Sequence, residues 1–120
     1  MSIITLILAG IVALEHLYIM YLETFATHSD TTSRVFNMSK EELQRESVTN
    51  LFKNQGIYNG LIAVFLLYGI FSNSQLLVTV FVLNVFFAAV YGAVTANKKI
   101  ILTQGGPAIL TLLSLIISLL

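Results

Sequence analysis

Two ionisable residues, Glu15 and His16, stand side by side in an apolar stretch near the start of the chain. An acid inside a bilayer costs about 3 kcal/mol on insertion scales, so it usually marks a proton relay, a binding site or an obligatory pair. Adjacent helix residues point about 100° apart, so Glu15 shares a face with Tyr18, whereas His16 shares one with Met20 and Glu23. Glu15 is therefore a stronger candidate than His16 for a functional residue within the membrane. For His16, a structural hydrogen bond and a role in proton transfer are equally good interpretations.

Further polar side chains follow helical spacing in the other apolar segments. Without water to solvate them, such groups should face the interior of a helical bundle. Their depth predicts that Glu15, Asn59, Tyr91 and Gln104 converge on one half of the membrane. The candidates for ligand binding or proton coupling are Glu15, His16, Tyr18, Asn54, Gln55, Tyr58, Asn59, Asn84, Tyr91 and Gln104. The alternative is that the amides and tyrosines only hold helices together.

Composition excludes several kinds of chemistry. The chain has no cysteine, so it has no thiolate ligand and no cysteine nucleophile. A single histidine within the spans, His16, with scattered carboxylates matches neither a zinc motif nor a di-iron bundle, and we expect no metal and no cofactor. Six basic residues balance six acidic ones, which leaves no basic stripe for nucleic acid. The expected partners are membrane lipids and a small lipophilic ligand.

The elements that must position these residues are membrane-spanning helices. The chain is 57% hydrophobic and 10% charged, and four stretches reach the roughly 20 apolar residues that a span needs. Polar turns at Ser72–Ser74 and Asn97–Lys99 make neighbouring spans antiparallel hairpins. We therefore predict one all-α domain, 1–120, an integral membrane four-helix bundle of two antiparallel transmembrane hairpins, with spans at 2–22, 51–71, 75–96 and 100–120.

The connection over 23–50 is longer and carries most of the remaining charge. Its Thr27–Ser33 portion is rich in Thr, Ser and Asp and is interpreted as loop. Ser39 followed by Glu42 forms a capping box, which predicts a helix from Lys40 that runs on into the second span. An i,i+4 pair between Glu41 and Arg45 would support it. The sequence thus predicts a short cytoplasmic helical extension before the second transmembrane helix.

Orientation follows from the positive residues near the spans. All six lie on one predicted side: Arg34, Lys40, Arg45, Lys53, Lys98 and Lys99. Because lysine and arginine accumulate in cytoplasmic loops, the charged loops should be cytoplasmic and both chain ends outside.

A family resemblance rests on the same polar residues. It is carried by Leu14-Glu15-His16 with Tyr18, Asn54-Gln55-Gly56, Tyr58-Asn59-Gly60, Tyr91-Gly92 and Gln104-Gly105-Gly106-Pro107-Ala108. With these motifs the chain resembles, over essentially its whole length, the bacterial membrane proteins of domain-of-unknown-function family 1304. The resemblance implies a four-helix protein of the bacterial inner membrane, and it brings no activity with it.

Three functions remain open on this basis. The first is binding, extending to proton-coupled transport, of a small lipophilic or cationic molecule in a cytoplasm-facing polar pocket; transport would need a homodimer, because four helices enclose little volume. The second is a membrane enzyme for a lipid-like substrate, with Glu15 or His16 as acid or base. The third is a purely structural membrane partner.

Overall fold

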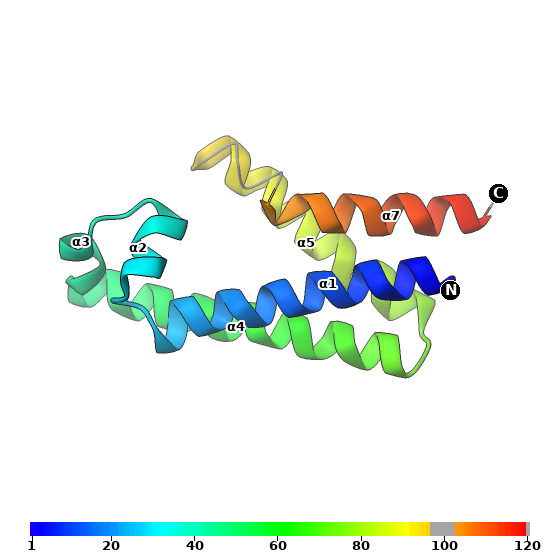
Figure 1. The fold of residues 1–120 in the computed structure, drawn as a ribbon, viewed down its shortest axis with the longest axis horizontal. Helices are drawn as coiled ribbons and strands as arrows, with labels where there is room; N and C mark the ends of the chain where they lie inside the picture. Colours follow the sequence, from blue (N-terminus) through cyan, green and yellow to red (C-terminus); the bar gives the residue numbers. More distant parts are fainter. Residues whose placement is uncertain (97–102, 120) are drawn as a thin grey trace. The chain divides into compact units, whose positions relative to one another are not determined.

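The computed structural model describes residues 1–96 and 103–119, which contain helices, turns and short loops but no strand. The all-α prediction is confirmed. The elements are α1 (Ile3–Met20), the π-helix η1 (Tyr21–Phe25), α2 (Asp30–Phe36), α3 (Lys40–Gln44), α4 (Glu46–Phe71), α5 (Gln75–Thr95) and α7 (Gly105–Leu119) (Figure 1).

The chain divides into two compact units. We call Met1–Glu15 with Ala63–Leu120 the terminal unit, and His16–Ile62 the central unit. Helices α1 and α4 each contribute residues to both.

Three helical segments are long and apolar enough to cross a membrane by length and composition: Ile3–Phe25, Glu46–Phe71 and Gln75–Thr95. At 1.5 Å per residue, each reaches the roughly 30 Å of a hydrocarbon core. The first continues beyond Leu22 to Phe25 through η1. The apolar helix α7 is shorter, with 15 residues. The predicted fourth span at 100–120 and the turn at Asn97–Lys99 fall partly or wholly outside the described residues, which exclude 97–102 and 120.

The turn between α4 and α5 is tight because Asn73 adopts a left-handed conformation, with φ of 53°. The amide of Ser74 donates to the Gly69 carbonyl (2.8 Å) and that of Asn73 to the Ile70 carbonyl (3.1 Å), which is the Schellman pattern. The Ser74 hydroxyl then accepts from the Leu77 amide and caps α5. The two helices are thereby turned back on each other within three residues.

In the central unit, the predicted loop at Thr27–Ser33 is wrong in part, because α2 begins inside it. Ser29 caps that helix by accepting a hydrogen bond from the Thr32 amide, and Asp30 occupies the first turn. The Thr32 hydroxyl donates to the carbonyl oxygens of Leu22 and Ala26 (3.1 and 2.7 Å). A run of Ser, Thr and Asp is as typical of a helix N-terminus as of a loop, because these side chains satisfy free backbone amides.

The predicted continuous helix from Lys40 into the second span is also corrected. The helix starts at Lys40 with Ser39 as its cap, but α3 ends at Gln44 and Arg45 is extended, with ψ of 132°. The Arg45 guanidinium lies 3.3 Å from Glu42, at i,i+3, instead of pairing with Glu41. Extended backbone at Arg45 moves its side chain off the helical i,i+4 position.

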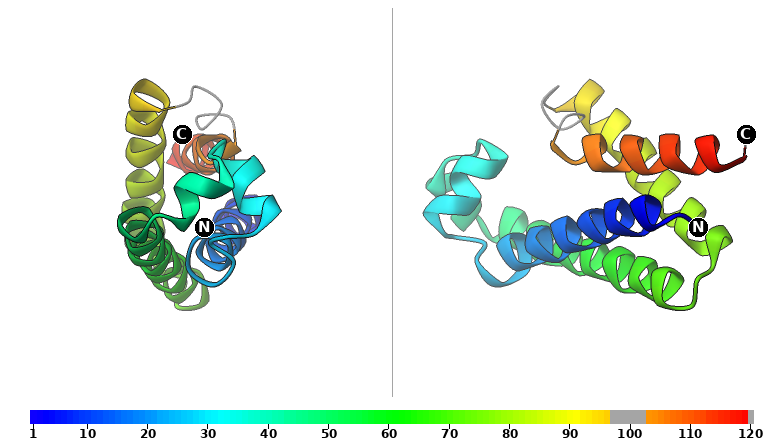
Figure 2. Two further views of the ribbon diagram at one scale, coloured as in Figure 1. Left: turned by 90° about the vertical axis from the view of Figure 1, so that its left-hand side faces the viewer. Right: turned by 45° about the vertical axis from the view of Figure 1, so that its right-hand side comes forward.

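The core of the terminal unit is built on small and branched side chains. Val78, Val82, Val85 and Ala89 make one buried stripe of α5, spaced as a helix face requires. The neighbouring α7 buries Gly105, Ala108, Thr111 and Leu115. Both views in Figure 2 show α5 and α7 next to each other.

A polar contact ties α1 to α7 in the same unit. The hydroxyl of Thr5, which is fully buried, lies 2.7 Å from that of Ser114 and 2.9 Å from that of Ser2. The Ser114 hydroxyl donates to the Thr111 carbonyl (2.7 Å).

Candidate functional site

A fully buried carboxyl group lies at the centre of η1. Glu23 is 0% exposed, although the sequence pattern places it at the start of the polar connection. The Ala26 amide donates to the Tyr21 carbonyl, five residues back, at 2.9 Å, which is the wide hydrogen-bond pattern of a π-helix. This π turn ends the first helix, a place where such turns are common.

The two oxygens of this carboxyl group are in different situations. Glu23 Oε1 accepts a hydrogen bond from Asn59 Nδ2 on α4 at 2.6 Å. Glu23 Oε2 is buried and has no hydrogen-bond partner in the described residues. A carboxylate offers about four lone-pair positions, and an unpaired buried polar atom is costly. The group therefore has an unused capacity to hold a proton or to accept a further donor.

Glycines on α4 allow η1 to come this close. A Cβ atom on Gly56 would overlap the Thr24 hydroxyl and lie 3.0 Å from the Thr24 backbone nitrogen, and one on Gly60 would overlap the Met20 sulfur. Small residues four apart let two membrane helices approach closely. Asn59, between these glycines, is thus held within reach of Glu23.

The basic residue Lys53 contacts the residue next to this acid, and its hydrogen bond goes to a backbone carbonyl. Lys53 Nζ donates to the Thr24 carbonyl at 3.4 Å, and the Thr24 hydroxyl donates to the Lys53 carbonyl at 3.0 Å. The ion pairs found among the described residues, Lys40 with Asp30 and Arg45 with Glu42, are exposed and do not include Glu23. In that part of the chain no group of three potential metal ligands occurs.

The sequence-predicted site residues fall into three groups by exposure. His16 is buried, and Glu15, Asn59 and Gln104 are half-buried. One Glu15 oxygen, Oε1, is buried without a hydrogen-bond partner in the described part of the chain. The exposed group comprises Tyr18, Asn54, Gln55, Tyr58, Asn84 and Tyr91.

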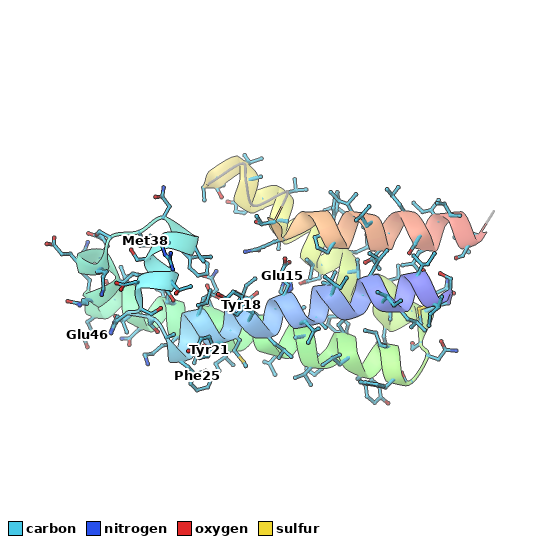
Figure 3. The ribbon with its side chains drawn as sticks, in the orientation of Figure 1. Glu15, Tyr18, Tyr21, Phe25, Met38 and Glu46 are labelled. Carbon is cyan, nitrogen blue, oxygen red and sulfur yellow. The ribbon has the colours of Figure 1, made fainter. Side chains whose placement is uncertain are left out.

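For this exposed group, the expectation that polar side chains face the interior is not met. Figure 3 shows Tyr18 projecting from α1, with Tyr21 and Phe25 following it on η1; their exposed fractions are 51%, 54% and 70%. Tyrosine at the end of a span is typical of the membrane interface, where its half-polar ring tolerates contact with both phases. The expectation that polar side chains face the bundle interior is therefore weaker for tyrosines near the membrane interface than for polar groups at the bilayer centre.

The predicted residues also divide between the units. Glu15, Asn84, Tyr91 and Gln104 belong to the terminal unit, and the other six, with Asn59 among them, to the central unit. The convergence of Glu15 with Asn59 stays a prediction. Within the central unit, Asn59 meets a different acid, Glu23.

Glu23 is the residue that sequence reasoning missed. It was assigned to the polar connection because the apolar run ends at Leu22. Two signals could have identified it. It lies seven residues after His16, on one helix face, and Asn59 stands between glycines four apart, a pattern that predicts a close partner helix.

Comparisons with known proteins identify the family of this chain. A family model described as "Protein of unknown function (DUF1304)" matches residues 10–116. An uncharacterized protein, YpaA, from Lactococcus lactis subsp. lactis (strain IL1403) is 64% identical over 116 residues, which cover 95% of this chain and 98% of that protein. No solved structure matches. The resemblance seen in the motifs is therefore confirmed, and the chain belongs to the DUF1304 family.

Proposed function

We propose that this protein binds a small lipophilic cation within the membrane, and that Glu23 and Asn59 are its polar anchor. The observation that carries the proposal is the unequal pairing of the Glu23 carboxyl: Oε1 accepts from Asn59, while the buried Oε2 has no partner in the described residues. An ammonium group would supply the missing donors and a compensating charge.

Proton coupling follows from the cost of burying charge. An unpaired carboxylate in an apolar environment is far less stable than the neutral acid. The empty site would therefore hold a proton, and a cation that replaced it would release that proton. Cation binding and proton release at Glu23 would then be thermodynamically coupled.

The ligand's apolar part follows from the surroundings of the site. Exposed apolar side chains lie two residues from Glu23 and Asn59 along each segment, with Tyr21 and Phe25 on η1 and Ile57 and Leu61 on α4. These residues lie within the segments that are long and apolar enough to span a membrane. A ligand that reaches Glu23 from the bilayer would need an alkyl or aryl body. In the proposed orientation the site lies toward the cytoplasm, because the positive residues of the chain gather beside that end of the spans.

The experiment compares hexylamine, which carries a charge at neutral pH, with hexanol, which does not. Both are titrated into purified protein by calorimetry in buffers of different ionisation enthalpy, which counts released protons. The wild type should bind the amine with proton release, and Glu23→Gln should weaken amine binding at least tenfold, about 1.4 kcal/mol, while hexanol binding stays unchanged. Asp30→Asn, which removes an exposed acid of the same unit, should have no effect.

Two results would contradict the proposal. One is amine binding by Glu23→Gln at wild-type strength. The other is loss of amine binding in Glu15→Gln with Glu23→Gln unaffected, which would transfer the role to Glu15 as the sequence alone suggests.

A second candidate function is purely structural, and the same hydrogen bond supports it. The contact of 2.6 Å between Asn59 and Glu23 joins residues 36 positions apart, so it could serve only to lock η1 onto α4. A glutamine at position 23 can still accept from Asn59. The structural role therefore predicts that Glu23→Gln changes neither stability nor any ligand response.

A further inference from the structure

Helix α5 has two faces of different character. Its buried face is the stripe Val78, Val82, Val85 and Ala89. The opposite face is exposed and consists of Val80, Asn84, Phe87, Ala88, Tyr91, Val94 and Thr95. In this outer face the Asn84 amide stands among mostly apolar side chains.

The position of this amide makes it unusual. Asn84 lies nine residues after Gln75 and eleven before Thr95, the two ends of α5. In a spanning helix that is the middle of the bilayer, where water is absent and lipid tails form no hydrogen bonds. No hydrogen-bond partner of Asn84 occurs among the described residues, whereas the Thr95 hydroxyl on the same face donates to the Tyr91 carbonyl at 2.8 Å. The amide requires a partner at its own depth.

We infer that this face of α5 packs against the same face of a second copy of the chain. Copies inserted in one orientation are related by a twofold axis along the membrane normal, so Asn84 of each copy lies at the same depth as its counterpart. An asparagine amide has both donors and an acceptor. Two of them related by a twofold axis can each donate to the other, which satisfies both without any other protein.

The surrounding residues suit a close helix pair. Ala88 follows Asn84 by four residues and Gly92 follows by another four, and small residues at this spacing allow membrane helices to approach. The six basic residues on one predicted side of the membrane favour a single insertion orientation. A parallel pair is the arrangement in which both amides meet.

The first experiment is disulfide crosslinking in lipid vesicles. The chain has no cysteine, so a single introduced thiol reports on one position. Ala88→Cys should form a covalent dimer under mild oxidation, because small residues let facing helices approach and a disulfide needs Cβ atoms about 3.5–4.5 Å apart. Val64→Cys, on an exposed position of α4 (52%), is the control and should form at least fivefold less. Equal yields at the two positions would overturn the inference.

The second experiment measures dimerisation by energy transfer between labelled copies as vesicles are diluted with lipid. Asn84→Leu should weaken the dimer about tenfold, since two interhelical hydrogen bonds are lost, and Asn84→Gln should retain most of the affinity. Monomeric wild-type protein at every dilution would mean that lipid covers this face, and it would overturn the inference. Glu23→Gln should dimerise normally, so this result is independent of the proposed cation site.

Discussion

Two polar contacts between helices, one in each unit, differ in how completely their hydrogen-bonding groups are paired. In the terminal unit, the hydroxyls of Ser2, Thr5 and Ser114 form a chain that ends on the Thr111 carbonyl. Each proton in that chain has an acceptor. In the central unit, the Glu23 carboxyl has one oxygen bonded to Asn59 and one with no partner in the described residues.

This difference is the reason for proposing a binding role for the contact in the central unit and not for the one in the terminal unit. In this chain every hydroxyl proton already has an acceptor, so the contact can hold α1 to α7 without a free donor. A buried acid with an unpaired oxygen costs stability, which a protein tolerates where the group is used. The first two of the following changes disrupt the contact in the central unit, the third disrupts the one in the terminal unit, and the fourth concerns an exposed pair.

The largest effect is expected for Gly56→Ala. The new Cβ would overlap the Thr24 hydroxyl and press on the Thr24 backbone nitrogen, which cannot move away as a flexible side chain can. We expect a loss of about 3 kcal/mol in the free energy of unfolding, typical of a severe overpacking change. The loss is measured by unfolding the protein in detergent while its helical content is monitored by circular dichroism. Gly10→Ala is the matched control, since nothing lies within 4 Å of its added Cβ, and equal losses in both would contradict the close approach.

Glu23→Ala should come next, with a loss of about 2 kcal/mol. It creates a cavity and leaves the Asn59 amide without its acceptor. Glu23→Gln should stay within about 0.5 kcal/mol of the wild type, because the amide oxygen can replace Oε1. The same unfolding measurement compares the pair. A large loss in Glu23→Gln would show that stability depends on the charge or proton itself.

Thr5→Val should cost about 1 kcal/mol, because it preserves the shape but interrupts the hydroxyl chain to Ser114. A double-mutant cycle with Ser114→Ala isolates the pair, and the coupling energy should be about 0.5–1 kcal/mol. Additive effects of the two changes would indicate that this hydrogen bond adds nothing to the contact of α1 with α7.

The smallest effect concerns pH. The hydrogen bond from Lys40 at 2.8 Å, together with its charge, lowers the pKa of Asp30 below its ordinary 3.8. A lowered pKa in the folded state adds stability above the ordinary value, and this contribution is lost as the pH falls through the lowered one. The pair is exposed, so the contribution is small. Carbon-13 NMR titration of the Asp30 carboxyl should give a midpoint below 3.8 in the wild type and a higher one in Lys40→Ala; equal midpoints would exclude the pairing.

The sequence predicted those features that depend on local chemistry. The polar turn at Asn73 formed because asparagine tolerates a left-handed backbone. The cap at Ser39 formed because its hydroxyl accepts from the Glu42 amide. Apolar runs of about 20 residues predicted the long helices, and three of these have the length and composition to span a membrane. Each of these signals lies within a few consecutive residues.

The features that were missed depend on contacts between distant segments. The burial of Glu23 requires Asn59, 36 positions away, and two glycines that bring α4 close. The break at Arg45 interrupts a stretch without proline or glycine, so no local breaker predicted it. Asn84 was expected to face inward by the rule for polar groups in membranes, but that rule cannot tell the inside of one chain from the inside of a dimer.

The π-helix η1 has a consequence for the comparison of relatives. A π turn accommodates about one residue more than an α turn. Deleting Leu22, directly ahead of Glu23, would bring Glu23 one position nearer to α1 and rotate it by about 100° about the helix axis. The length of this short segment therefore governs the chemistry as much as the identity of its residues does. In a relative, a one-residue gap at this point would separate the acid from its amide, even if every other polar residue were retained.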